Sequence, residues 1–433
     1  MPAAEPDTAE TNFGAAELKD LFNGLAGTPA VAIAVSGGSD STALLHLVRE
    51  WHSNEGAHVR LVALTVDHGL RTGSAEEAAK VAADCARWGI AHHTLHWMGE
   101  KPQTGIQAKA REARYDLLTR WCRAHGFAVL LTAHTADDQA ETVLMRSRRT
   151  QTPASLAGIW PERDWNGTKV MRPLLSVRRQ ALRQFLAMRG IGWSEDPSNT
   201  NERFERVRVR RILATANVPG LALQALEAQR VARELGQRGQ RWIAGNARAG
   251  QTGDIRLPAG ALAACPVVER LEIISAVIRS LRGTVSAERA ELLLLSHWLG
   301  SGAAGRRTLN GVMFQVRQNR GRLEVLCGRE PGRIAQRWDD VPDSGDGMGQ
   351  LEWDHRFLVA APAGSRIGPA RLAPDVPRLD RVPFWLHEGL PVIALRSGAC
   401  FLGISVKSDR HLELLGITVR ATYVNRLEGL PVA

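Results

Sequence analysis

Residues 31–48 read Val-Ala-Ile-Ala-Val-Ser-Gly-Gly-Ser-Asp-Ser-Thr-Ala-Leu-Leu-His-Leu-Val. An apolar run typical of a buried strand comes first, and an apolar run typical of a helix start comes last. The two glycines between them let backbone N–H groups approach an anion without an intervening side chain. Three serine hydroxyls and the positive end of the helix dipole add to this, so the segment predicts a phosphate-binding loop. A plain glycine turn is the alternative, and no Gly-Lys-Ser/Thr follows as in a Walker loop.

The pattern around this loop predicts an α/β fold. Strand-like and amphipathic helical segments alternate, which favours a doubly wound parallel sheet covered on both faces. The predicted strands are 31–35, 58–66, 91–96 and 127–133, and the predicted helices are 41–53, 74–88 and 104–125. Ligands bind beyond the carboxyl ends of such strands, and the polar motifs of this chain stand there.

The rest of the chain predicts a mostly helical middle part and a small α+β end. Residues 177–246 are helical in pattern, with Pro219-Gly220 as a break, and 260–300 are helical too. A β-hairpin is predicted from 307–316 and 323–326, followed by a linker at 329–350. The predicted domains are 1–216, 217–330 and 331–433.

Composition points to a soluble protein with a polyanionic partner. The 433 residues carry a net charge of +10. Residues 1–140 have a balance of −5 (12 basic, 17 acidic), residues 141–211 one of +8 (15 and 7), and the remainder one of +7 (28 and 21). This surplus indicates nucleic acid as a partner. Five scattered cysteines, no secretory signal and no membrane-spanning run indicate the cytoplasm.

A second polar motif follows the predicted strand at 127–133. Residues 133–142 read Ala-His-Thr-Ala-Asp-Asp-Gln-Ala-Glu-Thr, with three acids in the first turns of a helix. Acids are favoured there by the helix dipole, so capping is one interpretation. Three acids and His134 exceed what capping requires, and carboxylates suit a Mg²⁺-bound triphosphate.

These motifs together resemble those of a known family. The loop resembles the Ser-Gly-Gly-x-Asp-Ser pattern of the ATP pyrophosphatases (the PP-loop superfamily). With Asp-His-Gly-Leu at 67–70, Ala-Arg-x-x-Arg-Tyr at 110–115 and the acidic motif, the chain is similar to tRNA(Ile)-lysidine synthetases. Arg-Pro-Leu-Leu at 172–175, Trp-Ser-Glu-Asp-Pro-Ser-Asn at 193–199 and Trp-Asp-His-Arg-Phe at 353–357 extend the resemblance.

The resemblance implies a ligase that joins L-lysine to C2 of the wobble cytidine in the isoleucine tRNA with a CAU anticodon. Such enzymes use ATP and Mg²⁺ and pass through an adenylated tRNA, releasing pyrophosphate and AMP. The implied catalytic residues are Asp40, His134 and Asp137. The implied ATP-binding residues are Ser36, Gly37, Gly38, Ser39, Asp40, Ser41, Arg111 and Arg114. Metal would be held by Asp40 and Asp137, lysine or metal by Asp137, Asp138 and Glu141, and tRNA by Arg206, Arg208 and Arg210.

Two departures from the family pattern stand out, and other functions compete with this one. Thr135 stands where many members have a second histidine, and Arg148-Arg149-Thr150-Gln151 replaces a glycine-containing turn. A related tRNA thiolase would need catalytic cysteines, whereas Cys85 and Cys122 fit a helical core. A non-catalytic RNA-binding protein would not need the intact loop. A homodimer is an open possibility.

Overall fold

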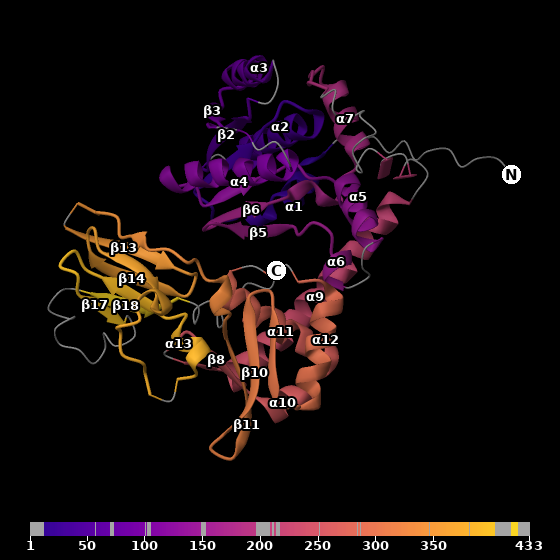
Figure 1. Ribbon diagram of the computed structural model, residues 1–433. Coiled ribbons are helices and arrows are strands. Elements are labelled where there is room, and N and C mark those ends of the chain that lie inside the picture. The colour runs from indigo at the N-terminus through magenta and orange to yellow at the C-terminus, as the bar shows by residue number, and fades with distance from the viewer. Residues whose placement is uncertain are drawn as a thin grey trace. The chain divides into compact units, whose positions relative to one another are not determined.

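The protein is described from a computed structural model that covers residues 13–56, 58–69, 73–99, 101, 105–148, 153–195, 208–209, 212–213, 217–250, 252–283, 285, 287–345, 347–380, 382–402 and 417–422. Its contacts divide the chain into two compact units, residues 1–232 and 233–433 (Figure 1). The division falls within the long helix α9 (Val218–Asn246). The three predicted domains, with boundaries at 216 and 330, stay a prediction.

The first unit contains a six-stranded sheet in the order β3-β2-β1-β4-β6-β5. All neighbouring strands are parallel except β5, an antiparallel edge strand. The strands are β1 (Ala30–Ala34), β2 (Arg60–Asp67), β3 (Ala91–His96), β4 (Val129–Leu131), β5 (Glu162–Trp165) and β6 (Thr168–Met171). The order reverses at β1, as in doubly wound folds. The predicted fold class and the four predicted strands are confirmed.

Helices cover both faces of this sheet. Val31 and Ile33 point to one hydrophobic cluster, whereas Ala30 and Ala32 point to another, because side chains alternate along a strand. The first cluster includes residues of α1, α2, α3 and α7, and the second is closed by α4. The helices of this unit are α1 (Ala15–Leu21), α2 (Ser39–Asn54), α3 (Ser74–Arg87), α4 (Ile106–Ala124), α5 (Ala136–Ser147), α6 (Pro153–Leu156) and α7 (Arg179–Met188), with 3₁₀ turns η1 (Asn23–Leu25) and η2 (Pro173–Ser176).

The second unit begins with a five-stranded antiparallel sheet, ordered β7-β8-β11-β10-β9. Its strands are β7 (Arg248–Ala249), β8 (Ile255–Pro258), β9 (Gly305–Leu309), β10 (Val312–Asn319) and β11 (Arg322–Arg329), and its helices are α10 (Ala259–Ala264), α11 (Val267–Arg282) and α12 (Arg289–Ser301). The predicted hairpin is present as β10–β11. However, the predicted single strand 307–316 is wrong, because Asn310 and Gly311 adopt φ of +53° and +73° and turn the chain between β9 and β10.

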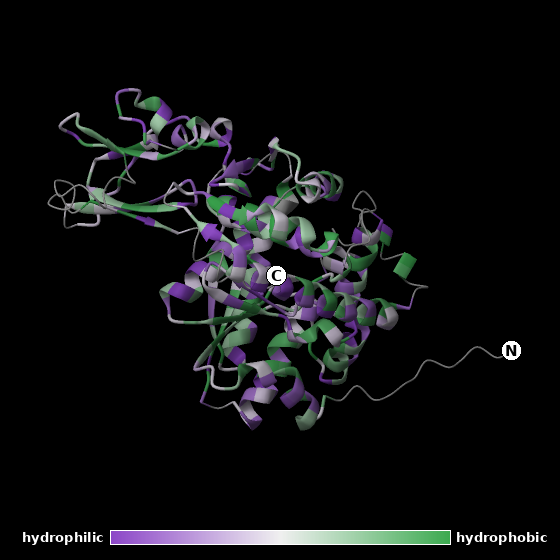
Figure 2. Cartoon of the chain, turned by 90° about the horizontal axis from the view of Figure 1, so that it is seen from below, coloured by the Kyte–Doolittle hydropathy of each residue, from purple (hydrophilic) through white to green (hydrophobic). Residues whose placement is uncertain are grey.

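Two smaller antiparallel sheets follow, ordered β12-β15-β16-β17 and β13-β14-β18. Their elements are η4 (Pro331–Arg333), β12 (Asp339–Asp340), β13 (Met348–Trp353), β14 (Phe357–Pro362), β15 (Arg366–Pro369), η5 (Ala370–Leu372), α13 (Phe384–His387), β16 (Pro391–Ala394), β17 (Cys400–Leu402) and β18 (Thr418–Ala421). The predicted linker 329–350 thus contains short elements. Figure 2 shows hydrophobic and hydrophilic residues interspersed along the helices, as expected of elements with one buried face. In the described part of the chain, no helix is long and apolar enough to cross a membrane.

The predicted helix break at Pro219-Gly220 is wrong, since both residues lie inside α9. Pro219 is the second residue of this helix. The N–H groups of a helix's first turn have no intrahelical acceptor, so a proline there removes no hydrogen bond. The residue that would break a helix interior is therefore compatible with its start.

A buried ion network joins the sheets of the second unit. Asp354, in the turn between β13 and β14, accepts hydrogen bonds from Arg329 of β11 (Nη2 to Oδ1, 3.0 Å) and from Arg356 (Nε to Oδ2, 2.8 Å). Arg356 also donates to the carbonyl oxygen of Gly389 at 2.6 Å. All three charged side chains are at least nine-tenths buried. The network connects the five-stranded sheet to the elements that follow it.

Candidate active site

The predicted phosphate-binding loop, residues 36–41, lies between β1 and α2, and its ends are joined by hydrogen bonds of Ser41. The Ser41 hydroxyl accepts from the Ser36 N–H at 3.1 Å and donates to the Gly38 carbonyl at 3.1 Å. Gly37 has φ of +83°, and a Cβ atom there would lie 3.2 Å from Val81 Cγ2. No side chain caps the N-terminus of α2. The first-turn N–H groups of α2 therefore remain available to an anion.

The second motif opens α5 directly after β4, and Thr135 caps this helix. The Asp138 N–H donates to Thr135 Oγ1 at 3.3 Å, and the Thr135 N–H donates back to Asp138 Oδ2 at 2.9 Å. This reciprocal capping box fixes the orientation of Asp138. Thr135, which stands where many family members have a second histidine, thus has a structural role as the cap of α5. Capping also accounts for part of the acidic motif, because it uses Asp138.

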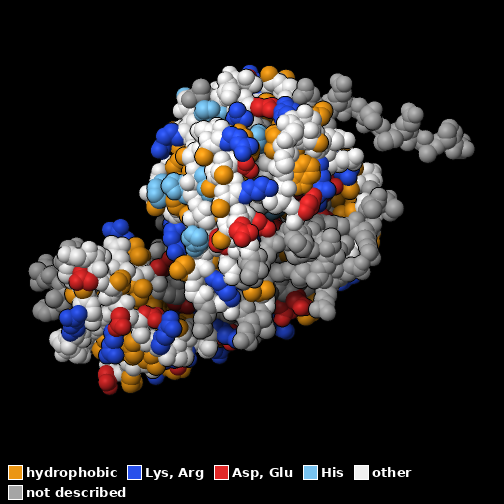
Figure 3. All heavy atoms as spheres, turned by 90° about the horizontal axis from the view of Figure 1, so that it is seen from above, with side chains coloured by type: hydrophobic (Ala, Val, Ile, Leu, Met, Phe, Trp, Pro, Cys, Tyr) orange, Lys and Arg blue, Asp and Glu red, His pale blue; other side chains and the backbone are white. Residues whose placement is uncertain are grey.

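Arg179, which the sequence analysis missed, connects the two motifs. Its Nε donates to Asp40 Oδ2 at 2.9 Å, and its Nη2 donates to Asp138 Oδ1 at 2.9 Å. Its Nη1 lies 3.5 Å from Glu141 Oε1. Asp40 comes from the loop and the other two acids come from α5, so one guanidinium bridges both halves of the site. Figure 3 shows a group of acidic side chains (red) with basic side chains (blue) around it.

Asp137 is held at the start of α7. Its Oδ2 accepts from the backbone N–H of Arg179 at 2.7 Å, and its two oxygens accept from Arg178 Nε and Nη2 at 3.2 and 3.3 Å. The described structure thus pairs Asp137 with Arg178, and pairs Asp40 and Asp138 with Arg179. Asp137 and Asp40 share no cation, although their partners are adjacent in the chain.

Two arginines of α4 reach the same end of the sheet. Arg111 Nη2 lies 3.4 Å from His134 Nε2, and Arg114 Nε donates to His68 Nε2 at 3.3 Å. Burial, and then the neighbouring Arg114, lower the pKa of His68 to about 4. His68 is therefore neutral at pH 7 and can accept the hydrogen bond. The predicted ATP-binding arginines both lie beside the loops that follow β2 and β4.

The pKa values of the central groups reflect their burial and their shared cation. Burial raises the pKa of Asp40, against the opposing effect of the Arg179 guanidinium. Burial acts in the same direction on Asp138, but Arg179 and His134 outweigh it and lower its pKa. Burial disfavours the charged form of Arg179, yet the carboxylates of Asp138 and Asp40 raise its pKa above the ordinary value. Arg179 is therefore charged at any physiological pH.

A further segment lies against the phosphate loop. The Ser194 N–H donates to the Gly37 carbonyl at 2.8 Å. Glu195 accepts from Arg183 Nη2 at 2.9 Å and from Trp193 Nε1 at 2.8 Å.

Of the three predicted tRNA-binding residues, the structure describes Arg208, which is exposed. Arg206 and Arg210 lie outside the described residues.

The acidic side chains offer the right chemistry for Mg²⁺ but do not converge on one point. Carboxylate oxygens are the ligands that Mg²⁺ prefers. Among the described residues, however, no three histidine, cysteine, aspartate or glutamate side chains are grouped so as to hold a metal ion. The guanidinium of Arg179 lies between Asp40, Asp138 and Glu141 instead. The carboxylates are thus of the chemical kind that Mg²⁺ prefers, but in the described structure they are arranged around the Arg179 guanidinium and not around a metal position.

The described cysteines do not provide a reactive thiol beside the loop. Burial raises the pKa of Cys85 to about 11 and that of Cys122 to about 12. Thiols react as thiolates, so both are inert near neutral pH. Both side chains also belong to the hydrophobic clusters on the two faces of the sheet. This disfavours the thiolase alternative for the described part of the site.

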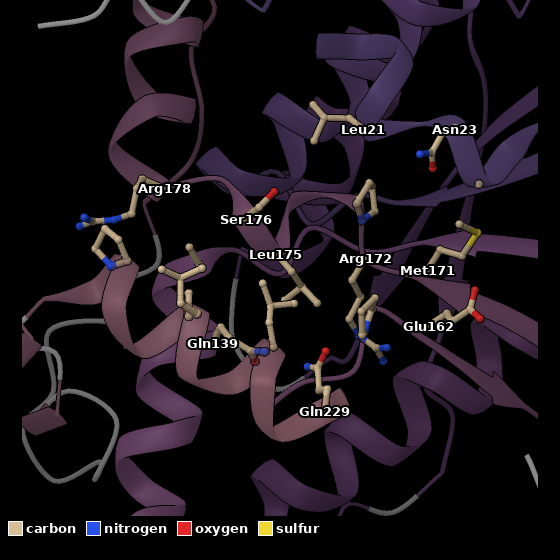
Figure 4. A pocket seen from close by; sticks show the side chains of 18 residues that line it. Leu21, Asn23, Gln139, Glu162, Met171, Arg172, Leu175, Ser176, Arg178 and Gln229 are labelled. Carbon is tan, nitrogen blue, oxygen red and sulfur yellow. The ribbon is translucent and has the colours of Figure 1, made fainter. Parts of the chain in front are cut away.

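A cavity of about 590 Å³ lies beside the acidic helix, with mainly apolar walls. Figure 4 shows Arg178 at one margin, Glu162 at another, and Leu175, Arg172 and Gln229 between them. Arg178 also contacts Asp137, so the cavity adjoins the acid cluster. The sequence did not predict this cavity, because its walls come from segments far apart in the chain.

The fold and the loop place the chain among the PP-loop proteins. The family model of the PP-loop domain matches residues 11–216, and such a domain implies the use of ATP. A tRNA(Ile)-lysidine synthase of Ruegeria pomeroyi is 36% identical over 376 residues, which cover 84% of this chain and 84% of the relative. One of Hyphomonas neptunium is 38% identical and covers 74% of this chain and 88% of the relative. The chain belongs to the tRNA(Ile)-lysidine synthase family.

Two other matches are partial. A tRNA(Ile)-lysidine synthase of Mesorhizobium japonicum is 48% identical over 229 residues, or 51% of this chain, and the match spans half of that relative's length. Among solved structures, a U34-tRNA thiolase of Methanococcus maripaludis gives a TM-score of 0.43 at 19% identity, covering 49% of this chain and 77% of the thiolase.

Proposed function

We propose that this protein uses ATP to join L-lysine to C2 of the wobble cytidine in the CAU-anticodon isoleucine tRNA, which changes its codon from AUG to AUA. Membership of the tRNA(Ile)-lysidine synthase family supports lysine and this tRNA as the two molecules that are joined. The observation that carries the chemistry is the junction at Arg179, which brings the phosphate loop and the acidic helix within one guanidinium's reach. An enzyme that clamps a triphosphate and also binds a cationic amine needs both motifs together.

The proposed reaction has two steps. The C2 oxygen of cytidine attacks the α-phosphorus of ATP, the bond to the β-phosphate breaks, and pyrophosphate leaves. The lysine ε-amine then attacks C2, a carbon–nitrogen bond forms, and AMP leaves with the former C2 oxygen while the amine gives up its proton. Forming the adenylate converts a poor leaving group into a good one, which is the general benefit of an activated intermediate.

The residues of the site divide between these tasks. The N–H groups at the start of α2 and the serines of the loop bind phosphate, and Arg111 and Arg114 neutralise triphosphate or AMP. Asp40 is the proposed metal ligand at the loop, with Asp137 as the second candidate. Bound Mg²⁺ would offset the charge of the departing pyrophosphate. His134 completes the proposed catalytic group at the end of β4.

The lysine ε-ammonium requires a carboxylate, and the start of α5 offers three. Asp137, Asp138 and Glu141 are the candidates for lysine or metal. Their position after β4 is at the carboxyl end of the sheet, where such folds bind ligands. The ammonium must approach near the activated C2 atom, so an acid adjacent to the phosphate loop suits the second step.

Binding of tRNA is assigned to the basic part of the chain. The segment with Arg206, Arg208 and Arg210 and the two proposed domains 217–330 and 331–433 carry the surplus of positive charge. Contacts with phosphate groups supply most of the affinity of such surfaces and make it salt-dependent. The reaction also requires that the anticodon loop present its wobble base unstacked.

The test is product analysis with purified full-length protein, ATP, Mg²⁺, lysine and the CAU-anticodon tRNA. We expect AMP and pyrophosphate in equal amounts, and a tRNA mass increase equal to lysine minus water at the wobble cytidine. Release of ADP, or modification of free cytidine but not of tRNA, would refute the proposal. A thiolase would instead require a sulfur donor, and a non-catalytic RNA-binding protein would release no pyrophosphate.

A further inference from the structure

A second arginine of α7, Arg183, lies beside the phosphate loop. It follows Arg179 by one helical turn, so both side chains lie on the same face of the helix. Its Nε atom lies 3.5 Å from the hydroxyl oxygen of Ser39, the loop residue that begins α2. This distance is long for a hydrogen bond, so Ser39 holds the guanidinium only weakly. A cation is therefore within reach of the helix start where an anion binds.

The carboxylate that pairs with Arg183 also lies close to the loop. Arg183 Nη2 donates to Glu195 Oε1 at 2.9 Å, and the Trp193 indole N–H donates to the same oxygen at 2.8 Å. The segment with Glu195 is joined to the loop, because the Ser194 N–H donates to the Gly37 carbonyl. A negative charge thus lies near a site for phosphate, and Arg183 offsets this charge.

The ion pair of Arg183 and Glu195 can be broken at little cost in stability. The two side chains are 45% and 61% exposed. Exposed ion pairs are weak, because water and salt screen the charges and because ordering two long side chains costs entropy. Arg179, in contrast, is 20% exposed and is bound by both Asp40 and Asp138. Of these two arginines, Arg183 is therefore the one that can exchange its carboxylate for a ligand.

We infer that Arg183 is a further ATP-binding residue, whose guanidinium turns from Glu195 to the pyrophosphate part of ATP when the nucleotide enters the loop. The inference deepens the proposed ATP-dependent reaction and rests on it. Arginine pairs with phosphate through two parallel N–H groups, and such charge-assisted hydrogen bonds are stronger than those between neutral groups. Glu195 keeps the indole N–H of Trp193 as a donor after Arg183 has turned away. Glu195 thus competes with the phosphates for one guanidinium.

The experiment is calorimetric titration of the full-length protein with ATP, and separately with AMP, in the absence of tRNA and lysine. Arg183→Gln should weaken ATP binding about 10–100-fold, as expected when hydrogen bonds between charged groups are lost. The affinity for AMP should not change, because AMP lacks the phosphates that Arg183 contacts. Equal ATP affinity of wild type and Arg183→Gln, or an equal loss of affinity for AMP, would overturn the inference.

Glu195→Gln distinguishes phosphate binding from a structural link between α7 and residues 193–195. Glutamine keeps an oxygen that can accept from Trp193 but removes the charge that competes for Arg183. ATP should therefore bind about 2–5-fold more tightly to this variant. If Arg183 were only a structural link, both substitutions would weaken that link, and neither would tighten ATP binding. Unchanged or weaker ATP binding by Glu195→Gln would overturn the inference, even if Arg183→Gln did not fold.

Arg189→Gln is the matched control, because it removes one positive charge from the C-terminal cap of the same helix. Arg189 pairs with Glu50, which lies towards the C-terminal end of α2 and not at the loop. This variant should bind ATP as the wild type does. A loss of ATP affinity equal to that of Arg183→Gln would assign the effect to net charge and overturn the inference. Because the titrations contain neither tRNA nor lysine, failure of the proposed lysine transfer is seen separately, in the product analysis.

Discussion

Gly37→Ala tests whether the loop conformation is what binds ATP. Gly37 adopts φ of +83°, which costs a residue with a Cβ atom roughly 1–2 kcal/mol. The added Cβ would also lie 3.2 Å from Val81 Cγ2, so a neighbour must move by a few tenths of an ångström. The free loop can relax to relieve this strain, but the binding-competent loop cannot. The strain therefore appears as lost affinity, about 5–30-fold in the dissociation constant of ATP.

The assay is calorimetric titration with ATP, together with thermal unfolding. Gly89→Ala is the matched control: Gly89 has φ of +68° after α3, and a Cβ atom there has open space. The control should lose about 1 kcal/mol of stability and bind ATP as the wild type does. If Gly37→Ala bound ATP normally while Gly89→Ala lost stability as expected, the loop would be only a turn, and the reasoning would fail.

Three further outcomes are expected. Asp40→Asn should slow pyrophosphate release by about 3 kcal/mol of barrier while tRNA binding is retained; near-normal turnover would make Asp40 a helix-start residue only. Burial lowers the pKa of His46 to about 4. Between pH 6.5 and 4, the unfolded protein therefore binds a proton at this residue that the folded protein does not bind. Stability should therefore fall by about 1–3 kcal/mol as pH drops through that window, and His46→Gln should flatten the change in melting temperature. Asparagine is compatible with the left-handed backbone of residue 354, but Asp354→Asn leaves Arg329 and Arg356 buried without their carboxylate. The free energy of unfolding of the second unit should therefore fall by about 3 kcal/mol, and an unchanged melting curve would contradict this.

The parallel sheet could be predicted because its pattern is local. Buried strands such as β1 are continuous apolar runs, and the helices between them have apolar residues at helical spacing. Predictions failed where the same residue type is compatible with two different local structures. Proline breaks a helix interior but suits the start of α9, and Asn310-Gly311 lies within an apparent single strand that it in fact folds into two.

The acidic helix and the phosphate loop could be predicted from their residues, but their connection could not. Arg179 is 139 residues from Asp40 in the chain, and in the sequence it is one more arginine in a basic region. Only the packing of α7 against α2 brings the two together. The Arg-Pro-Leu-Leu motif shortly before it was the available signal, because it marks the return of the chain to the end of the sheet.

The capping role of Thr135 limits what Asp138 can offer a ligand. Asp138 Oδ2 is occupied by the Thr135 N–H and hydroxyl, at 2.9 and 3.0 Å, so only Oδ1 faces Arg179. A metal ion bound at the start of α5, as proposed above, would meet a single oxygen from Asp138. Calcium commonly binds both oxygens of a carboxylate and takes six to eight ligands. Magnesium is usually bound by one or two carboxylates and retains several waters. For the proposed metal ion, the threonine that begins this helix would thus favour magnesium over calcium.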